Sequence, residues 1–229
     1  TLFDTLLRKI KMNKFDLQQH LRAEVADIRE PQCPIEDKIL VDTNVLYFCY
    51  YDRFSQLDIL GTGPAKYQTI KYPAFLNKLL SSKTILFVHK IGLLEFANTV
   101  AKAELQILYC TINNVSKIGE DFTPKNMCRA YPDEYRRIQG QLVCYLHSIK
   151  KTFKLLNSNI SIEHLLEDFL IEWQDSLADP GDAMMVAGAK REGINSVLSD
   201  DAAFVTLKGI KVYTANNAAI NAYQAKRKN

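Results

Sequence analysis

The sequence lacks the features that mark membrane-spanning and secreted proteins. Among its 229 residues, no apolar run approaches the roughly 18 residues that a transmembrane helix needs. Residues 1–14 carry charges throughout, unlike the apolar centre of a secretory signal. We therefore predict that the protein has no membrane partner.

Cysteine and histidine are scarce, and neither forms a recognisable disulfide or metal pattern. The five cysteines never show C-x-x-C spacing, and their odd number argues against a disulfide framework. Only Cys144 and His147 lie close enough in sequence to share a metal, and no second pair completes a zinc site. These features predict a reducing compartment and hence a cytoplasmic location.

An excess of charge of one sign is also missing. The formal net charge is +3, with 24% charged and 47% hydrophobic residues, which is ordinary for a globular protein. Such a small excess permits an anionic partner without demanding one. A phosphate-binding P-loop is absent too, because residues 61–64 (Gly-Thr-Gly-Pro) do not match G-x-x-x-x-G-K-[ST] and follow no predicted strand.

The most informative stretch that is present runs over residues 38–46. Residues 39–41 (Ile-Leu-Val) form an apolar run without alternation, which favours a strand buried on both faces of a parallel sheet. Asp42, Thr43 and Asn44 follow directly, at the end of a strand where α/β sheets bind ligands. A simpler interpretation is that Asp42 or Thr43 only caps the next helix.

The same kind of pattern recurs along the chain. Three more short apolar runs predict strands at residues 84–88, 196–199 and 210–214. Apolar spacing predicts helices at about residues 45–55, 73–80, 91–97, 183–192 and 218–229. Alternating strands and helices are typical of an α/β fold with a mainly parallel sheet.

Two regions fall outside this alternation. In residues 1–34, apolar residues at helical spacing are followed by two prolines, so we predict an N-terminal helical extension with helix up to residue 30. We predict that residues 35–229 form one α/β domain with a helical insertion at about residues 99–177. No strand is predicted within the insertion, and the spacing of residues 138–156 and 161–173 predicts two amphipathic helices.

Acidic side chains follow predicted strands or open predicted helices at four places. Parallel strands end at the same edge of a sheet, so these groups can converge. Close carboxylates repel each other and raise each other's pKa, and Mg²⁺ or Mn²⁺, which prefer oxygen ligands, would offset that repulsion. The chemistry that fits is metal-assisted hydrolysis of a phosphodiester bond. The four places are Asp42, Glu95, Asp182 and Asp200-Asp201.

Each of these acids also has an ordinary interpretation. Glu95 alone is explained equally well as a helix-surface acid. Asp182 fits a helix N-cap, and capping and metal binding can coexist. Asp200-Asp201 fits a simple turn.

Taken together and in order, the motifs resemble those of the PIN-domain ribonucleases, a family that includes the toxin components of VapBC-type toxin–antitoxin pairs. The matching stretches are residues 40–46 (LVDTNVL), 94–95 (LE), 181–183 (GDA) and 199–204 (SDDAAF). The resemblance covers about residues 35–100 and 178–216. It implies a PIN-like central parallel sheet flanked by helices, and an endoribonuclease that depends on Mg²⁺ or Mn²⁺.

The resemblance also assigns roles to particular residues. The implied catalytic, metal-binding set is Asp42, Glu95, Asp182 and Asp201, and the implied supporting set is Asn44, Ser199 and Asp200. The spacing to Phe204 favours Asp201 over Asp200 as the fourth acid without excluding Asp200. Ala183 and the helix after it favour Asp182 over Asp179.

Substrate and partners complete the prediction. The resemblance implies an RNA substrate and, through its toxin members, leaves open an antitoxin or other protein partner and a homodimer. Lys150, Lys151 and Lys154, at the end of a predicted insertion helix, are candidate RNA-binding residues, with a solvated helix face as the simpler alternative. The sequence also leaves open a second function, a catalytically weak PIN-fold module that binds RNA or protein through its insertion.

Overall fold

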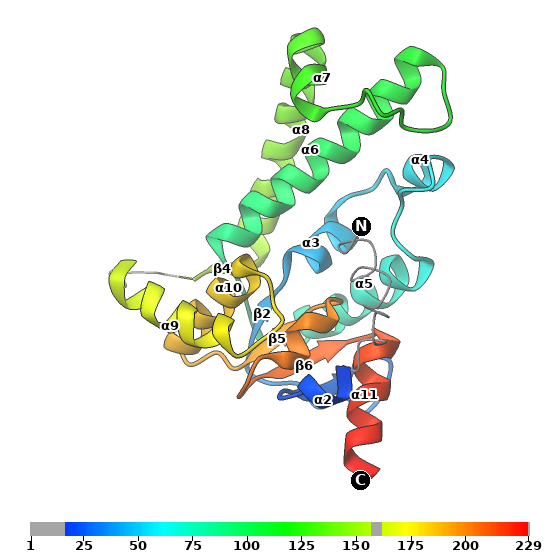
Figure 1. Ribbon diagram of the computed structural model, residues 1–229. Coiled ribbons are helices and arrows are strands. Elements are labelled where there is room, and N and C mark those ends of the chain that lie inside the picture. The colour runs from blue at the N-terminus through cyan, green and yellow to red at the C-terminus, as the bar shows by residue number, and fades with distance from the viewer. Residues whose placement is uncertain (1–16, 157–161, 229) are drawn as a thin grey trace, which may run out of the picture.

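The chain folds around one parallel β-sheet. In the computed structural model, which describes residues 17–156 and 162–228, six strands lie in the order β1-β6-β5-β2-β3-β4, and all neighbours run parallel (Figure 1). The strands are β1 (Glu24–Asp27), β2 (Lys38–Val41), β3 (Ile85–Val88), β4 (Lys154–Leu155), β5 (Ser196–Leu198) and β6 (Lys211–Thr214). The predicted α/β class, a parallel sheet flanked by helices, is confirmed.

The central strands are buried on both faces, as their unbroken apolar runs predict. In β2, Ile39 and Val41 pack into a cluster on one side of the sheet, and Leu40 packs into a cluster on the other side. All three side chains are almost fully buried. The sheet therefore forms the middle of three layers, with helices on both of its faces.

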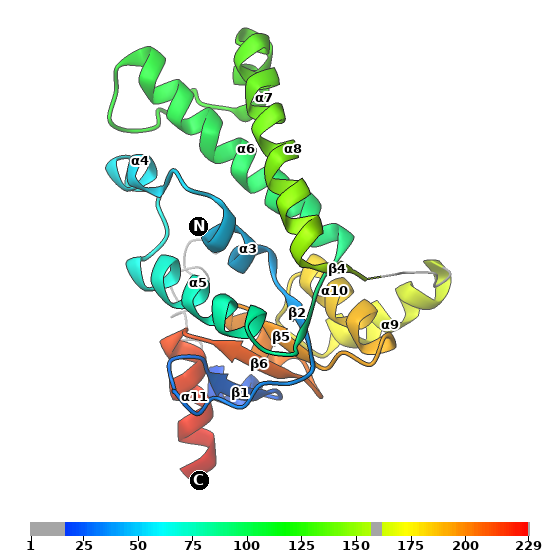
Figure 2. The same cartoon turned by 180° about the vertical axis from the view of Figure 1, so that it is seen from behind.

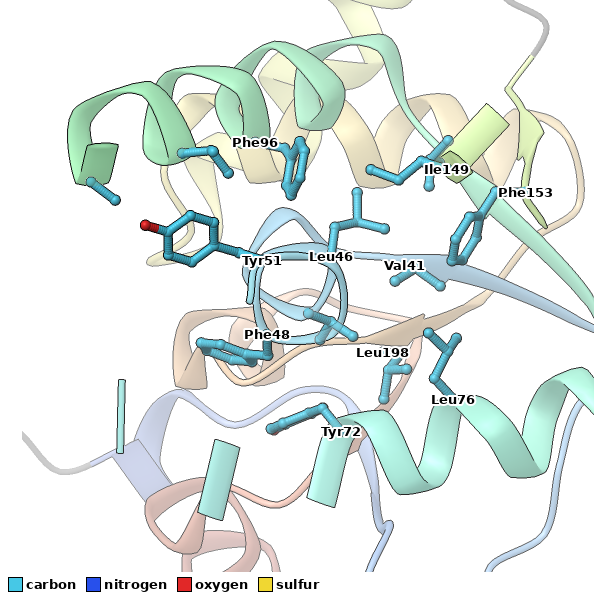
Figure 3. Close-up of a cluster of buried hydrophobic side chains, with 14 of the residues drawn as sticks. Val41, Leu46, Phe48, Tyr51, Tyr72, Leu76, Phe96, Ile149, Phe153 and Leu198 are labelled. Atoms are coloured by element: carbon cyan, nitrogen blue, oxygen red, sulfur yellow. The ribbon is translucent and has the colours of Figure 1, made fainter. Parts of the chain in front are cut away.

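One helical layer is built by helices that follow β2 and β3. They are α3 (Thr43–Tyr50), α4 (Phe54–Ile59), α5 (Lys66–Leu80), α6 (Lys90–Asn113) and α8 (Pro132–Thr152). Figure 3 shows their apolar side chains, among them Leu46 of α3, Leu76 of α5 and Phe96 of α6, gathered in one cluster with Val41 and Leu198 of the sheet. This layer fixes the start of α3, which directly follows Asp42.

The other layer covers the opposite face of the sheet. It contains α2 (Leu17–His20), α10 (Pro180–Arg191), the 3-10 helix η1 (Ala202–Thr206) and α11 (Asn217–Lys228), and α9 (Ile162–Gln174) packs against α10. Small residues such as Ala183, Ala187 and Gly188 let α10 lie close to the sheet, and all three are buried. The start of α10 is thereby fixed near the ends of the strands.

An arm made of α6, α7 (Pro124–Ala130) and α8 projects from the body of the molecule (Figures 1 and 2). Helix α6 packs against both α7 and α8. The chain returns from the arm at β4, where Leu155 lies opposite Val88 of β3. The arm thus leaves and rejoins the sheet at the carboxyl end of β3. Although α6 has 24 residues, no helix among the described residues is long and apolar enough to cross a membrane.

The helix predicted up to residue 30 is wrong for residues 24–27, which form β1. This strand pairs with β6 from Glu24 opposite Lys211 to Asp27 opposite Thr214. The spacing of apolar residues there also fits a helix, but Val25 and Ala26 are buried on opposite faces of the sheet, as alternation along a strand requires. Residues 1–16 of the predicted helical extension lie outside the described residues.

Two smaller predictions also need correction. Residues 154–155 form the short strand β4 inside a region predicted to have no strand, and both are exposed at the edge of the sheet. Pro73 lies inside α5 and not at its first turn. Helix α5 begins earlier because the Gln68 side chain accepts a hydrogen bond from the backbone N–H of Ala65 at 2.6 Å, which satisfies a donor at the helix start.

Candidate active site

The order in which the chain adds strands to the sheet reverses between β2 and β5. From β2 it continues to β3 and β4 on one side, and it later returns to β5 and β6 on the other. In open α/β sheets, such a switch point opens a crevice at the carboxyl ends of the two strands. Asp42 follows β2 and Ser199 follows β5, and Ser199 Oγ donates a hydrogen bond to Asp42 Oδ2 at 2.8 Å.

Asp42 occupies the N-cap position of α3, but its side chain makes no capping hydrogen bond. Only 2% of the residue is exposed. Burial raises the pKa of its carboxyl group to about 7, with smaller contributions in the same direction from the charges of Asp201 and Glu95, while the Ser199 hydroxyl and the Thr43 backbone act in the opposite direction. The simple capping interpretation therefore does not account for Asp42.

Glu95 reaches the same site from the second turn of α6. Its Oε2 accepts a hydrogen bond from Thr43 Oγ1 at 2.8 Å, and this hydroxyl lies 3.4 Å from the backbone oxygen of Gly92. Thr43 is buried, so it ties the first turn of α3 to the first turns of α6. The sequence suggested Thr43 only as a helix cap, because a contact between side chains 52 residues apart leaves no local pattern.

Asp182 enters from the start of α10. Asp179, and not Asp182, is the N-cap of this helix, because its Oδ1 accepts a hydrogen bond from the backbone N–H of Asp182 at 2.9 Å. Burial raises the pKa of Asp182 to about 9, and the charges of Asp42, Asp179, Asp201 and Glu95 add to the rise. The run Asp-Pro-Gly-Asp carries the signal for the true cap, since proline favours the first helical position after an N-cap.

Gly181 allows α10 to begin close to Glu95. A Cβ atom at this position would lie 2.6 Å from Glu95 Oε1 and 3.2 Å from Asp179 Oδ1. Any other residue would therefore have to displace the Glu95 carboxylate. The sequence motif includes this glycine, but the need for a glycine arises from the packing of α6 against α10 and cannot be seen in the sequence.

The two adjacent aspartates after β5 point in different directions. Asp201 is exposed, caps η1 by accepting a hydrogen bond from the Ala203 backbone at 2.7 Å, and donates its own N–H to Ser199 Oγ at 2.9 Å. Its charge contributes to the raised pKa of both Asp42 and Asp182. Asp200 is buried and bonded to α5 instead. The structure thus brings Asp201 to the acidic group and leaves Asp200 outside it.

The remaining predicted residues do not join the acidic group. Asn44 is exposed on the first turn of α3, and within the described part of the chain no hydrogen bond joins it to an acid of the site. Lys150 and Lys151 end α8 and Lys154 lies on β4, and all three are exposed. They belong to the base of the arm and not to the acidic group.

The carboxylates of the candidate site are the kind of ligand that a hard divalent cation prefers. Their side chains do not, however, surround a single point. Among the described residues, no lysine or arginine forms an ion pair with Asp42, Glu95, Asp182 or Asp201. In the same part of the chain, no three His, Cys, Asp or Glu side chains are grouped closely enough to hold a metal ion. Carboxylate oxygens are the ligands that Mg²⁺ and Mn²⁺ prefer, so binding would require these side chains to draw together.

Comparisons with known proteins find similar chains among solved structures but not among family models or curated proteins. No family model matches the chain, and no curated protein matches it significantly. The crystal structure of VapBC2 from Rickettsia felis, bound to a promoter DNA fragment, matches 77% of this chain and 98% of its own at 10% identity and a TM-score of 0.44. FitAB bound to the IR36 DNA fragment matches 77% of this chain and 94% of its own at 14% identity and a TM-score of 0.39. Both TM-scores are too low to support an argument about function.

Proposed function

We propose that the protein is a Mg²⁺- or Mn²⁺-dependent endoribonuclease that hydrolyses RNA phosphodiester bonds. The observation that supports this proposal is that four separate segments carry carboxylates at the switch-point end of the sheet, where Ser199 Oγ contacts Asp42 and Thr43 Oγ1 contacts Glu95. The raised pKa values of Asp42 and Asp182 reflect their burial together with the charges of their acidic neighbours. Such an arrangement is unfavourable without a cation and well suited to one.

The proposal divides the site into residues that bind the metal and residues that orient them. Asp42, Glu95, Asp182 and Asp201 would hold the metal. Held by these residues, a divalent ion would act as a Lewis acid that activates water and offsets charge on the phosphate. Ser199 orients Asp42 and Thr43 orients Glu95 through the hydrogen bonds described above, and such supporting contacts fix ligand geometry.

The base of the arm is the proposed RNA contact. Lys150, Lys151 and Lys154 are exposed, and none of them forms an ion pair with another described residue. Lys154 lies opposite Phe87, near the end of β3 from which α6 begins. Exposed lysines near a phosphodiester-cleaving site can bind neighbouring phosphates, and that binding weakens as salt rises.

The sequence motifs that resemble those of PIN-domain toxins add a protein partner to the proposal. By that resemblance the partner would be an antitoxin, another protein or a second copy of this chain, and the protein would act in the cytoplasm. A catalytically weak RNA- or protein-binding module is the second candidate function. It is favoured by one observation, that no three potential ligands are grouped closely in the described residues.

Cleavage of RNA by the full chain tests the proposal. With Mn²⁺ present, the wild-type protein should cut RNA, and both excess EDTA and Asp42→Asn should abolish the cut, because the variant removes the carboxylate charge while keeping the shape. Asp133→Asn is the matched control, since Asp133 is exposed at the start of α8 and pairs only with Arg136 among the described residues. Full cleavage by Asp42→Asn, or in EDTA, would sink the proposal, and binding of RNA without cleavage would favour the second candidate.

A further inference from the structure

Asp200 is a buried carboxylate that the proposed reaction does not use. Its oxygens accept hydrogen bonds from the hydroxyl of Tyr72 at 2.6 Å, from the hydroxyl of Tyr67 at 3.0 Å, and from Nε2 of Gln68. Asp200 is only 7% exposed, and no lysine or arginine pairs with it in the described ranges. Three neutral donors from one helix, α5, therefore satisfy this charge.

Tyr72 joins this carboxylate to the backbone of two loops. Its hydroxyl accepts a hydrogen bond from the backbone N–H of Ala215 at 3.0 Å, and it lies 3.1 Å from Thr214 Oγ1 and 3.3 Å from the backbone oxygen of Ser199. Asn216 Nδ2 donates to the backbone oxygen of Asp200 at 2.7 Å. The loop after β5 is thus fastened both to α5 and to the loop after β6.

The loop after β5 carries two residues of the candidate site, Ser199 before Asp200 and Asp201 after it. Ser199 Oγ donates to Asp42 at 2.8 Å and accepts from the Asp201 backbone at 2.9 Å. Because these three residues are consecutive, a shift of Asp200 moves the Ser199 hydroxyl and the Asp201 carboxylate together. The contacts of Asp200 with α5 therefore set where both groups stand relative to Asp42.

We propose that Asp200 is a positioning residue: Tyr72, assisted by Tyr67 and Gln68, holds its carboxylate on α5 and so places Ser199 and Asp201 against Asp42. This inference rests on the proposed metal-dependent function, and it names the part of the fold that prepares that site. It opposes the alternative that Asp200 is itself a metal ligand.

Tyr72→Phe tests the inference because it removes the hydroxyl and keeps the ring. Tyr213→Phe is the matched control: Tyr213 is equally buried, but its hydroxyl donates to the backbone oxygen of Pro34 at 2.9 Å, before the amino end of β2. Calorimetric titration of the full chain with Mn²⁺ should show binding weakened roughly tenfold to a hundredfold in Tyr72→Phe and unchanged in Tyr213→Phe. If Asp200 were a ligand, Tyr72→Phe would free its carboxylate, and unchanged or tighter binding would overturn the inference.

A second readout does not depend on metal. In EDTA, the backbone N–H of Asp201 should exchange with solvent deuterium faster in Tyr72→Phe than in the wild type, because its acceptor, Ser199 Oγ, is no longer held in place. Exchange at this amide should stay unchanged in Tyr213→Phe. Equal exchange in all three proteins would overturn the positioning role. A wild-type protein that binds no Mn²⁺ would instead overturn the proposed function, and the exchange result would still decide the role of Tyr72.

Variants of Asp200 cover the case in which Tyr72→Phe fails to fold. Asp200→Asn keeps one carbonyl oxygen that can accept from Tyr72, so its loss of Mn²⁺ affinity should be smaller than that of Asp200→Ala. Asp201→Asn, which removes a proposed ligand, should lose more affinity than Asp200→Asn. The reverse order would show that Asp200 is the ligand and would contradict the positioning role.

Discussion

The two edges of the sheet hold acidic side chains in opposite circumstances. At the amino edge, a hollow of about 610 Å³ contains Glu24 and Glu36, which pair with Lys211 Nζ at 3.3 and 2.7 Å. At the carboxyl edge, Asp42 and Asp182 are buried, and no lysine or arginine pairs with them within the described ranges. Their pKa values rise to about 7 and about 9, chiefly through burial and then through neighbouring acids.

The difference lies in how the acidic charges are balanced. Charges at the amino edge are balanced within the chain and partly exposed to water, so they contribute modestly to the fold. At the carboxyl edge, where α/β sheets bind ligands, no lysine or arginine of the described residues balances the buried acids. A buried group with a strongly perturbed pKa in such a place is a candidate for function.

Removing one carboxylate should therefore change the free energy of unfolding in opposite directions at the two edges. In EDTA at pH 8, Asp182→Asn should raise the free energy of unfolding by a value on the order of 2 kcal/mol, because the aspartate must take up a proton or bury its charge on folding and the amide need do neither. Glu36→Gln, the matched change at the amino edge, should lower it by at most about 1 kcal/mol. Urea denaturation measures both, and a destabilised Asp182→Asn would break the comparison.

The same contrast has a pH signature. An acid whose pKa is higher in the folded than in the unfolded state binds its proton more tightly when folded, so stability falls as pH rises between the two values. That window runs from 3.8 to about 7 for Asp42 and from 3.8 to about 9 for Asp182. Thermal melts in EDTA should show the wild type losing stability across this window and Asp182→Asn losing less. Parallel curves for the two proteins would count against the raised pKa of Asp182.

Gly181→Ala should lower the affinity for Mn²⁺ without lowering the stability of the fold. The new Cβ would lie 2.6 Å from Glu95 Oε1, and this flexible side chain can move aside at low cost. Mn²⁺ affinity should fall by about tenfold, as for other contacts that orient a ligand. Gly140→Ala in α8 is the control, because a Cβ there meets nothing within 4 Å, and it should raise helix stability while leaving Mn²⁺ affinity unchanged. Equal Mn²⁺ affinity in both variants would show that Glu95 is not a ligand.

The smallest expected effect concerns the binding of RNA by the lysines at the base of the arm. Replacing Lys150, Lys151 and Lys154 with Gln should lower the slope of log affinity for RNA against log salt by about 0.7 for each phosphate that these lysines neutralise in the wild type. Arg136→Gln with Arg137→Gln is the control, because both arginines already pair with acids one helical turn away, at 2.6 and 2.9 Å. An unchanged slope after the lysine changes would leave packing or self-association as the role of this helix end.

Local patterns predicted the parts of the fold that local contacts decide. The buried run before Asp42 predicted β2, and the acids after strands indicated the edge of the sheet that carries the candidate site. Strand β1 was missed because its partner β6 lies 187 residues further along the chain, so nothing nearby distinguishes its apolar spacing from that of a helix. The two residues of β4 were missed because both are exposed, and their pairing with β3 uses only backbone groups.

The site itself shows a similar division between what sequence can and cannot predict. The candidate acids were chosen from their place after strands or at helix starts, but the different surroundings of Asp200 and Asp201 depend on Tyr67 and Tyr72, which lie more than 120 residues earlier in the chain. The role of Thr43 toward Glu95 likewise depends on how α3 meets α6. Contacts between elements that are distant in sequence leave no periodicity to detect.

Calorimetric titration of the full chain with Mn²⁺ at pH 7, in two buffers with different ionisation enthalpies, tests the central claim most directly. If the four acids form a metal site, Mn²⁺ should bind and release protons, because Asp42 and Asp182 must lose theirs to act as ligands. Asp42→Asn should weaken binding and reduce the proton release, and the control Asp133→Asn should behave like the wild type. A wild-type protein that binds no Mn²⁺, or an Asp42→Asn variant that binds it equally well with the same proton release, would contradict the account.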